Sequence, residues 1–255
     1  MDELKLTFLG QAGTMLEYKG RRLVTDPHLS TFLEQGATEA NPWKRLYPAP
    51  TTLEALHPDA IVISHSHADH LDPWTLKPYY EAGGKAPLVV PAPEAPRAEA
   101  YCPTLTPARA WEGLTIGDFG ILPIPCAHTQ LHTDDLGRFR ELSYEITCGG
   151  IRVFFGGDLS LYDGLEAYLA TRHFDIMILP VNGADEDRTS RGIIGNINEV
   201  QAASLAKACG AILFPMHHDL YAINGCSPER IRAAAAEAGT RLMLLSVMQT
   251  ATYTQ

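Results

Sequence analysis

The sequence predicts an α/β protein in which two sheet-and-helix halves pack together, with the sheets inside and the helices outside. Three observations support this fold class. Strand-length apolar segments open the chain, strands and helices then alternate, and the same order is repeated after Trp111. No linker interrupts the middle of the chain, and 45% of the 255 residues are hydrophobic, so we expect one domain over residues 1–255.

The first half is expected to begin with an antiparallel meander, because short apolar segments alternate with glycines. Residues 28–50 contain Pro42, Pro48 and Pro50 and predict a long loop, a feature that is often functional. The predicted strands span 4–10, 14–18, 22–27, 59–64 and 86–91, and the predicted helices span 72–83, with a break or kink near Pro78, and 94–101.

The second half repeats this order. Strands are predicted over 114–127, 142–150, 151–158, 174–181, 211–219, 241–247 and 249–254. Helices are predicted over 161–173, 198–210 and 227–239, the last with Ser227 as N-cap and Pro228 in the first helical position. A polar, glycine-rich loop is predicted over 182–195.

Charge and cysteine content exclude several classes of protein. The net charge of −10 disfavours nonspecific binding to nucleic acid or to an anionic membrane, so neither partner is expected. No apolar run has the length of a membrane span, and the start MDELKLTFLG has no signal-peptide pattern. Five scattered cysteines without a CxxC pair suit a reducing cytoplasm. A homo-oligomer is compatible with these features.

The motif His65-x-His67-x-Asp69-His70 follows the buried strand 59–64. Side chains at i and i+2 of an extended segment point the same way, so His65 and His67 can bind one ion. Asp69 and His70 come where the chain bends, so they can bind a second ion. Imidazole and carboxylate are ligands of Zn²⁺, Fe and Mn²⁺. The alternative is a histidine-rich loop without metal.

Further candidate ligands follow other apolar strands. His128, Asp158 and His217 each come directly after such a segment, and Gly156 and Gly157 allow close approach of the backbone before Asp158. Asp158 could bridge two ions, because a carboxylate has two oxygens. Each of these residues taken alone is more often structural than a ligand.

The whole pattern resembles the metallo-β-lactamase superfamily, whose fold is an αββα four-layer sandwich. The resemblance covers the chain and rests on HxHxDH followed by His, Asp and His at strand ends. It implies two divalent ions, most often Zn with Mn or Fe as alternatives. One ion would be held by His65, His67 and His128, the other by Asp69, His70 and His217, with Asp158 bridging.

A closer resemblance is to the L-ascorbate-6-phosphate lactonase group. It rests on the segment SRGIIGNINEVQAASLAKACGAILFPMHHDLYAIN, on Ser64–Asp72 and on Gly157–Tyr162. This resemblance implies a lactonase that acts on a phosphorylated or anionic sugar lactone.

The expected mechanism follows from charge. Two divalent ions carry about +4, and Asp69, Asp158 and a hydroxide return about −3, so the centre keeps about one positive charge. This charge favours a metal-bridging hydroxide as nucleophile, with Asp69 and Asp158 as catalytic residues and a metal-held aspartate moving a proton. Asp26 and Asp72 could orient ligand imidazoles, although Asp72 could equally be a helix N-cap.

The candidate substrate-binding residues are Arg188, Arg191, His218 and Tyr162. A guanidinium suits phosphate or carboxylate, which fits a small anionic substrate, but a solvated loop arginine is an equal alternative. Two other functions compete with a lactonase. One is a phosphodiesterase for a small or lipid phosphodiester, and the other is a non-catalytic protein that binds or senses metal.

Overall fold

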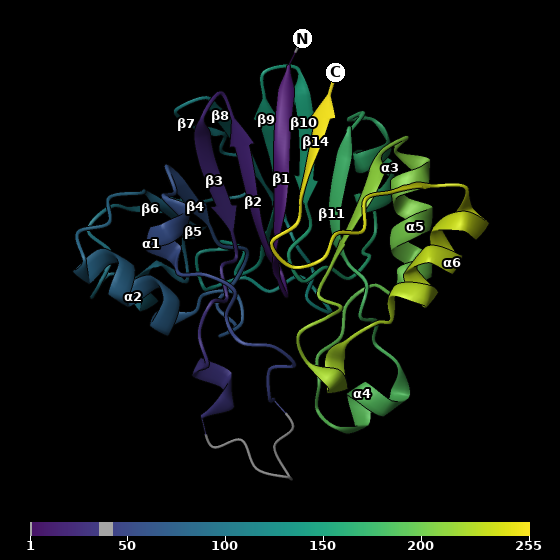
Figure 1. The fold of residues 1–255 in the computed structure, drawn as a ribbon, viewed down its shortest axis with the longest axis horizontal. Coiled ribbons are helices and arrows are strands. Elements are labelled where there is room, and N and C mark those ends of the chain that lie inside the picture. Colours follow the sequence, from purple (N-terminus) through teal and green to yellow (C-terminus); the bar gives the residue numbers. More distant parts are fainter. Residues whose placement is uncertain (1, 36–42) are drawn as a thin grey trace.

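The computed structural model describes residues 2–35 and 43–255, which form four layers in the order helix, sheet, sheet, helix (Figure 1). Each sheet has seven strands, and each is antiparallel in one part and parallel in the other. The predicted αββα sandwich is therefore confirmed. Both chain ends lie at the same end of the sheets, opposite the loops that carry α4.

The first sheet combines the opening meander with the last strand of the chain. Its order is β14 (Thr250–Thr254), β1 (Glu3–Gly10), β2 (Gly13–Tyr18), β3 (Arg21–Thr25), β4 (Ala60–Val62), β5 (Leu88–Pro91) and β6 (Leu105–Ala108). Strands β14 to β3 pair antiparallel, as the short glycine-containing turns between β1, β2 and β3 require. Strands β3 to β6 pair parallel.

The second sheet repeats this arrangement. Its order is β13 (Arg241–Leu242), β12 (Ile212–Met216), β11 (Ile176–Pro180), β10 (Ile151–Phe155), β9 (Leu142–Cys148), β8 (Phe119–Pro125) and β7 (Leu114–Ile116). Strands β7 to β10 are antiparallel, and β10 to β13 are parallel. The parallel strands are connected through helices, which cover the outer face of the sheet.

The helices form the two outer layers. The first sheet is covered by α1 (Leu53–Leu56) and α2 (Pro73–Glu81), and the second by α3 (Leu165–Ala170), α5 (Glu199–Ala208) and α6 (Pro228–Ala238) (Figure 1). Short segments near the loops are α4 (Glu186–Ser190) and the 3₁₀ turns η1 (Phe32–Glu34), η2 (Ala95–Arg97) and η3 (Ala222–Asn224). None of the helices in the described ranges is long and apolar enough to cross a membrane.

Three apolar clusters hold the layers together. The central cluster lies between the sheets and includes Leu6, Leu16, Tyr144 and Phe155. The other two join each sheet to its helices. Because apolar area removed from water contributes about 25 cal/mol per Å², these clusters dominate the stability of the fold.

Several predicted elements differ from the structure. The helix predicted over 161–173 begins only at Leu165, and the loop predicted over 182–195 contains α4. The strand predicted over 241–247 pairs only at Arg241–Leu242. Helix α2 continues through Pro78 without a break, and Ala82 still donates to the Pro78 carbonyl.

The sequence prediction missed α1 and β6, which have four residues each and therefore little periodicity. The predicted loop 28–50 is irregular in its described parts, with only η1 and one isolated bridge from Arg45 to Tyr221. Residues 36–42 of this prediction lie outside the described ranges.

Candidate metal centre

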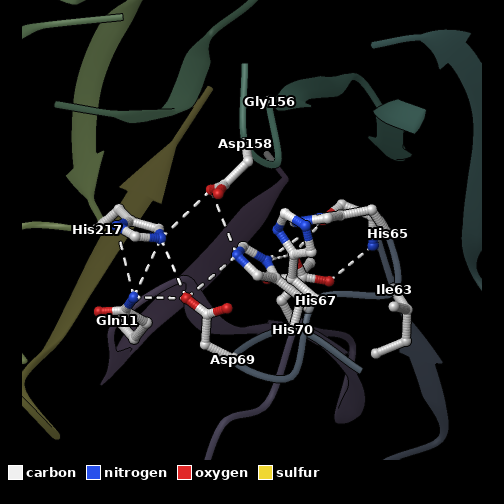
Figure 2. Close-up of polar contacts among 12 residues, drawn as sticks. Gln11, Ile63, His65, His67, Asp69, His70, Gly156, Asp158 and His217 are labelled. Carbon is white, nitrogen blue, oxygen red and sulfur yellow. Dashed lines mark hydrogen bonds and ion pairs between the residues drawn. The ribbon is translucent and has the colours of Figure 1, made fainter. Parts of the chain in front are cut away.

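The seven predicted ligands lie together at the edge of the sandwich where several strands end. The 65–70 motif follows β4, His128 follows β8, Asp158 follows β10 and His217 follows β12. Figure 2 shows the side chains of Asp69, His70, Asp158 and His217 directed toward one another. The fold thus gathers residues that are up to 152 positions apart, from His65 to His217 (217 − 65 = 152).

The first ligand group contains His65, His67, His128 and Asp158, whose ligand atoms all lie within 4.8 Å of one another. His128 Nε2 is 3.2 Å from His67 Nδ1 and 3.5 Å from Asp158 Oδ2. Three imidazoles and a carboxylate at this spacing fit a tetrahedral or larger coordination shell.

The second ligand group contains Asp69, His70 and His217, again within 4.8 Å. His217 Nε2 lies 3.3 Å from Asp69 Oδ2, and His70 Nε2 lies 3.7 Å from the same oxygen. Asp158 Oδ1 is 3.3 Å from His70 Nε2 and 3.4 Å from His217 Nε2. Asp158 therefore turns one oxygen toward each group, as the predicted bridging role requires.

Buried polar atoms without a hydrogen-bond partner point to what the cluster holds. His65 Nε2, His70 Nε2 and Asp158 Oδ1 are among the buried atoms that have no partner in the described protein. A buried polar atom without a partner is costly, so such atoms in one cluster indicate a missing bond. Imidazole nitrogens together with carboxylate oxygens are the donor set of divalent transition metals, so these residues fit the metal that the sequence predicted.

The charge states of the ligands follow from burial and from their mutual contacts. Burial, together with repulsion from His70, lowers the pKa of His65 well below its usual value, and burial lowers that of His128 to about 4. Burial opposes ionisation of Asp69 and Asp158, but His70 and His217 outweigh it and hold both carboxyl pKa values well below the usual range. The two acids are therefore ionised and His65 and His128 are neutral, which are the states that bind metal.

The two remaining imidazoles balance the acids. Burial opposes charge on His70 and His217, but attraction by Asp158 and Asp69 raises the pKa of both imidazoles above its usual value. The two carboxylates thus favour positive charge at the second ligand group, where a bound cation would supply it.

Asp26 and Asp72 have different roles. Asp26 Oδ2 accepts a hydrogen bond from His70 Nδ1 at 2.6 Å. Asp26 therefore orients the imidazole of a predicted ligand, which is the role that the sequence suggested for it. Asp72 caps α2 by accepting from the amides of Trp74 and Thr75, and it also bonds His28. His28 is not in either ligand group, so Asp72 is a helix cap and does not orient a ligand.

Gly157 allows the turn that carries Asp158 to lie close to the segment that carries Ser64 and His65. Its φ is +61°, in the left-handed region, and a Cβ at this position would lie 2.6 Å from the Cβ of Ser64. Ser64 in turn donates to Asp26. Glycine therefore lets the turn after β10 pack against the strand end that carries His65.

The predicted substrate-binding residues are not gathered at the ligand groups. Arg188 pairs with Asp185 and donates to the Gly225 carbonyl, while Arg191 pairs with Asp187 at 2.7 Å and has a side chain that is 52% exposed. Tyr162 donates its hydroxyl to the Pro125 carbonyl. His218 is buried and its ring stacks on Phe8 at 5.4 Å, away from the ligand groups. Their role in substrate binding stays a prediction.

A pocket of about 300 Å³ opens onto the ligand groups. Apolar side chains and four of the predicted ligands line it. The lining residues are Leu33, Trp43, His67, Ala68, Asp69, Asp158, Gly192, Ile193, Ile194, His217 and Asn224. No sequence motif indicated these apolar lining residues or Gln11, whose side-chain nitrogen lies 2.8 Å from Asp69 Oδ2. A polar residue at the end of the first strand was the signal for Gln11.

Comparison with known proteins agrees with this geometry. The family model described as beta-lactamase superfamily domain matches residues 21–218. A protein of Archaeoglobus fulgidus named UPF0173 metal-dependent hydrolase is 25% identical over 241 residues, which are 92% of each chain.

Two further similarities differ in their extent. The mitochondrial N-acyl-phosphatidylethanolamine-hydrolyzing phospholipase D of Saccharomyces cerevisiae is 39% identical over 87 residues, 33% of this chain and 18% of that protein. The solved structure of Igni18, a metallo hydrolase from Ignicoccus hospitalis, superposes with a TM-score of 0.75 at 19% identity over 99% of both chains.

Proposed function

The chain belongs to the metallo-β-lactamase superfamily and is a metal-dependent hydrolase, and on that premise we propose that it opens the ester bond of a small lactone. The observation that carries the proposal is the cluster of buried, unpartnered ligand atoms beside the pocket of about 300 Å³. A pocket of this size suits a compact substrate, because drug-sized ligands fill roughly 300–1,000 Å³.

The two ligand groups would each hold one metal ion. His65, His67 and His128 would hold one ion, Asp69, His70 and His217 would hold the other, and Asp158 lies between the two groups. Bound ions would lower the pKa of water toward neutrality and polarise the substrate carbonyl.

The chain's own residues supply the remaining chemistry. Hydrolysis of a lactone takes one proton from the attacking water and returns one to the leaving ring oxygen. Asp69 lines the pocket, its side chain is 13% exposed and its carboxyl group is ionised, so it can accept that proton and pass it on. Asp158 is more deeply buried, which suits a fixed negative charge between the ligand groups.

The pocket walls suit a substrate with an apolar side. Leu33, Trp43, Ile193 and Ile194 line the same pocket as the ligands, and apolar side chains there would help to exclude water from the reacting bond. We keep the expectation of a small anionic substrate as part of this proposal. Arg191 is the candidate partner of the anion, because its exposed guanidinium can exchange Asp187 for a substrate group.

The proposal predicts metal-dependent turnover of lactones. The purified protein should contain divalent metal, lose activity when a chelator removes it, and recover when Zn²⁺ or Mn²⁺ is restored. His67→Ala should lower kcat/KM for the best lactone by at least about 100-fold, since ligand loss exceeds the 10- to 100-fold cost of losing a supporting residue. His57→Ala is the matched control, because His57 caps α1 and belongs to neither ligand group. Activity that survives both metal removal and His67→Ala would refute the proposal.

A phosphodiester is the second candidate substrate. The similarity over 87 residues to the yeast phospholipase D favours it, since the name of that enzyme describes phosphodiester cleavage. Lactones and phosphodiesters, each with and without an anionic substituent, should be assayed together. Turnover of phosphodiesters alone would exclude the lactonase, and a preference for anionic lactones that Arg191→Gln abolishes would support the anionic substrate.

A further inference from the structure

We propose that Gln11 is a positioning residue of the second ligand group, where it fixes the positions of the Asp69 and His217 side chains relative to each other. Its side-chain nitrogen lies 2.8 Å from Asp69 Oδ2 and 3.0 Å from His217 Nε2 (Figure 2). No other described side chain outside the ligand groups lies within hydrogen-bond distance of both of these residues. The inference concerns the metal centre on which the proposed function rests, and it names a residue outside the predicted ligand set.

The local backbone places Gln11 at this point. Residues 10–13 form the turn between β1 and β2, and Gln11 has a φ of +53°, which is uncommon for a residue other than glycine. Gly10 has a φ of +95°, and a Cβ there would collide with the Tyr47 hydroxyl. The turn is thus packed into a conformation that directs the Gln11 side chain inward, where it is 1% exposed.

The Gln11 side chain donates a hydrogen bond to the Asp69 carboxylate. An amide NH₂ has two hydrogens and no lone pair to accept with, so Gln11 Nε2 donates to Asp69 Oδ2. A carboxylate oxygen has lone pairs to spare, so this bond remains compatible with metal binding by Asp69. The amide therefore restricts Asp69 to the side of the pocket where His217 lies.

The backbone of the same residue restrains the other ligand. The Gln11 carbonyl accepts from the His217 amide at 2.7 Å, and the Gln11 amide donates to Asp219 Oδ1 at 3.2 Å. Asp219 also accepts the Tyr47 hydroxyl at 2.6 Å. One residue in the first strand turn therefore connects a ligand from the first half of the chain to one from the second.

Loss of the Gln11 amide should affect the second ligand group and not the first. Residues that orient metal ligands typically change metal affinity by about 10- to 100-fold when removed. Gln11 lies within hydrogen-bond distance of Asp69 and His217 and has no hydrogen bond to His65, His67 or His128 among the described residues. Removing its amide should therefore weaken the second ion and leave the first unchanged.

Two substitutions separate the amide from the turn. Gln11→Asn keeps an amide that is one methylene too short to reach Asp69, and Asn tolerates positive φ better than Gln does. Gln11→Met keeps the length and removes the donor. The control is Gln35→Met, because Gln35 is exposed and, within residues 2–35 and 43–255, its side-chain amide donates only to the Phe32 carbonyl.

The test is a Co²⁺ titration of the metal-free full-length proteins, followed by d–d absorption and by equilibrium dialysis. Wild type and Gln35→Met should bind two ions. Gln11→Asn and Gln11→Met should bind the first ion as wild type does and the second about 10- to 100-fold more weakly. Wild-type binding of the second ion, equal weakening of both ions, or a single ion in the wild type would overturn the proposal. No substrate enters this test, so its result is independent of whether the protein is a lactonase.

Discussion

At the scale of single residues, hydrogen bonds from neighbouring residues orient the metal ligands and so direct the lone pairs that would bind an ion. Asp26 is fully buried and accepts from the Ser64 amide at 2.7 Å, from the Ser64 hydroxyl at 2.5 Å and from His70 Nδ1 at 2.6 Å. Because His70 donates from Nδ1, its Nε2 faces Asp69 and Asp158 and is free to bind an ion.

We therefore predict that Asp26→Asn weakens metal binding at the second ligand group by about 10- to 100-fold. The substitution preserves shape but removes the charge that holds the His70 proton on Nδ1. The measurement is Zn²⁺ affinity from competition with a chromophoric chelator.

Asp72→Asn is the matched control for this prediction. Asp72 is equally buried and also bonds a histidine, but that histidine, His28, is in neither ligand group. Asp72→Asn should lower the free energy of unfolding and leave Zn²⁺ affinity unchanged. Equal Zn²⁺ affinities of Asp26→Asn and wild type would contradict the proposed role of Asp26.

At the scale of elements, short local signals define where helices begin and end. Helix α6 starts at Ser227, whose hydroxyl accepts from the Arg230 amide at 3.3 Å, and ends at Gly239, which has a φ of +65°. Its buried residues Ile231, Ala234 and Ala235 share one face, as a period of 3.6 residues requires.

The N-cap of α6 should contribute measurably to stability. Ser227→Ala is expected to lower the free energy of unfolding by about 1 kcal/mol, because the Arg230 amide loses its acceptor. Ser227→Asp retains an acceptor and should remain close to wild type. Urea denaturation followed by circular dichroism measures both, and equal losses in the two variants would show that the cap does not stabilise α6.

At the scale of the whole molecule, contacts between the two halves keep the ligand groups together. The Tyr144 hydroxyl in β9 donates to the Ile63 carbonyl at 2.8 Å, just before the 65–70 motif. Tyr253 in β14 donates to Asp175 at 2.7 Å, next to β11. The packing between the sheets buries Cys148, and the packing of helices on the sheets buries the other four cysteines, so all five are buried free thiols.

This burial predicts that native thiols react slowly. Burial raises the pKa of Cys148 to about 12 and those of Cys209 and Cys226 to about 11, so the reactive thiolate is scarce below pH 9. The native protein should react negligibly with Ellman's reagent at pH 8, and the rate should rise as pH approaches 11. Protein unfolded in guanidinium should react with five equivalents of Ellman's reagent at pH 8. A rapid stoichiometric reaction of the native protein at pH 8 would contradict this degree of burial.

Local patterns predicted most of the fold. The alternation of strands and helices and the N-cap of α6 at Ser227 lie in short stretches of sequence, where periodicity and turn residues act directly. The boundaries of α3 and β13 were not predictable in this way, because pairing and packing with distant segments decide where they end.

By itself, the sequence determined the two-sheet architecture and the positions from which the 65–70 motif, His128, Asp158 and His217 could bind metal, because side-chain direction follows from local backbone geometry. Only the tertiary structure decided that Asp26 supports His70, that Asp72 caps a helix and that Gln11 reaches Asp69 and His217. It also decided that Arg188 and Arg191 pair with Asp185 and Asp187. The contacts of Asp26 and Gln11 join residues far apart in the chain, and no local pattern encodes which of several polar groups will come within hydrogen-bond distance. Asp72 and the two arginines bond residues only two to four positions away, but the sequence allowed other roles for each of them.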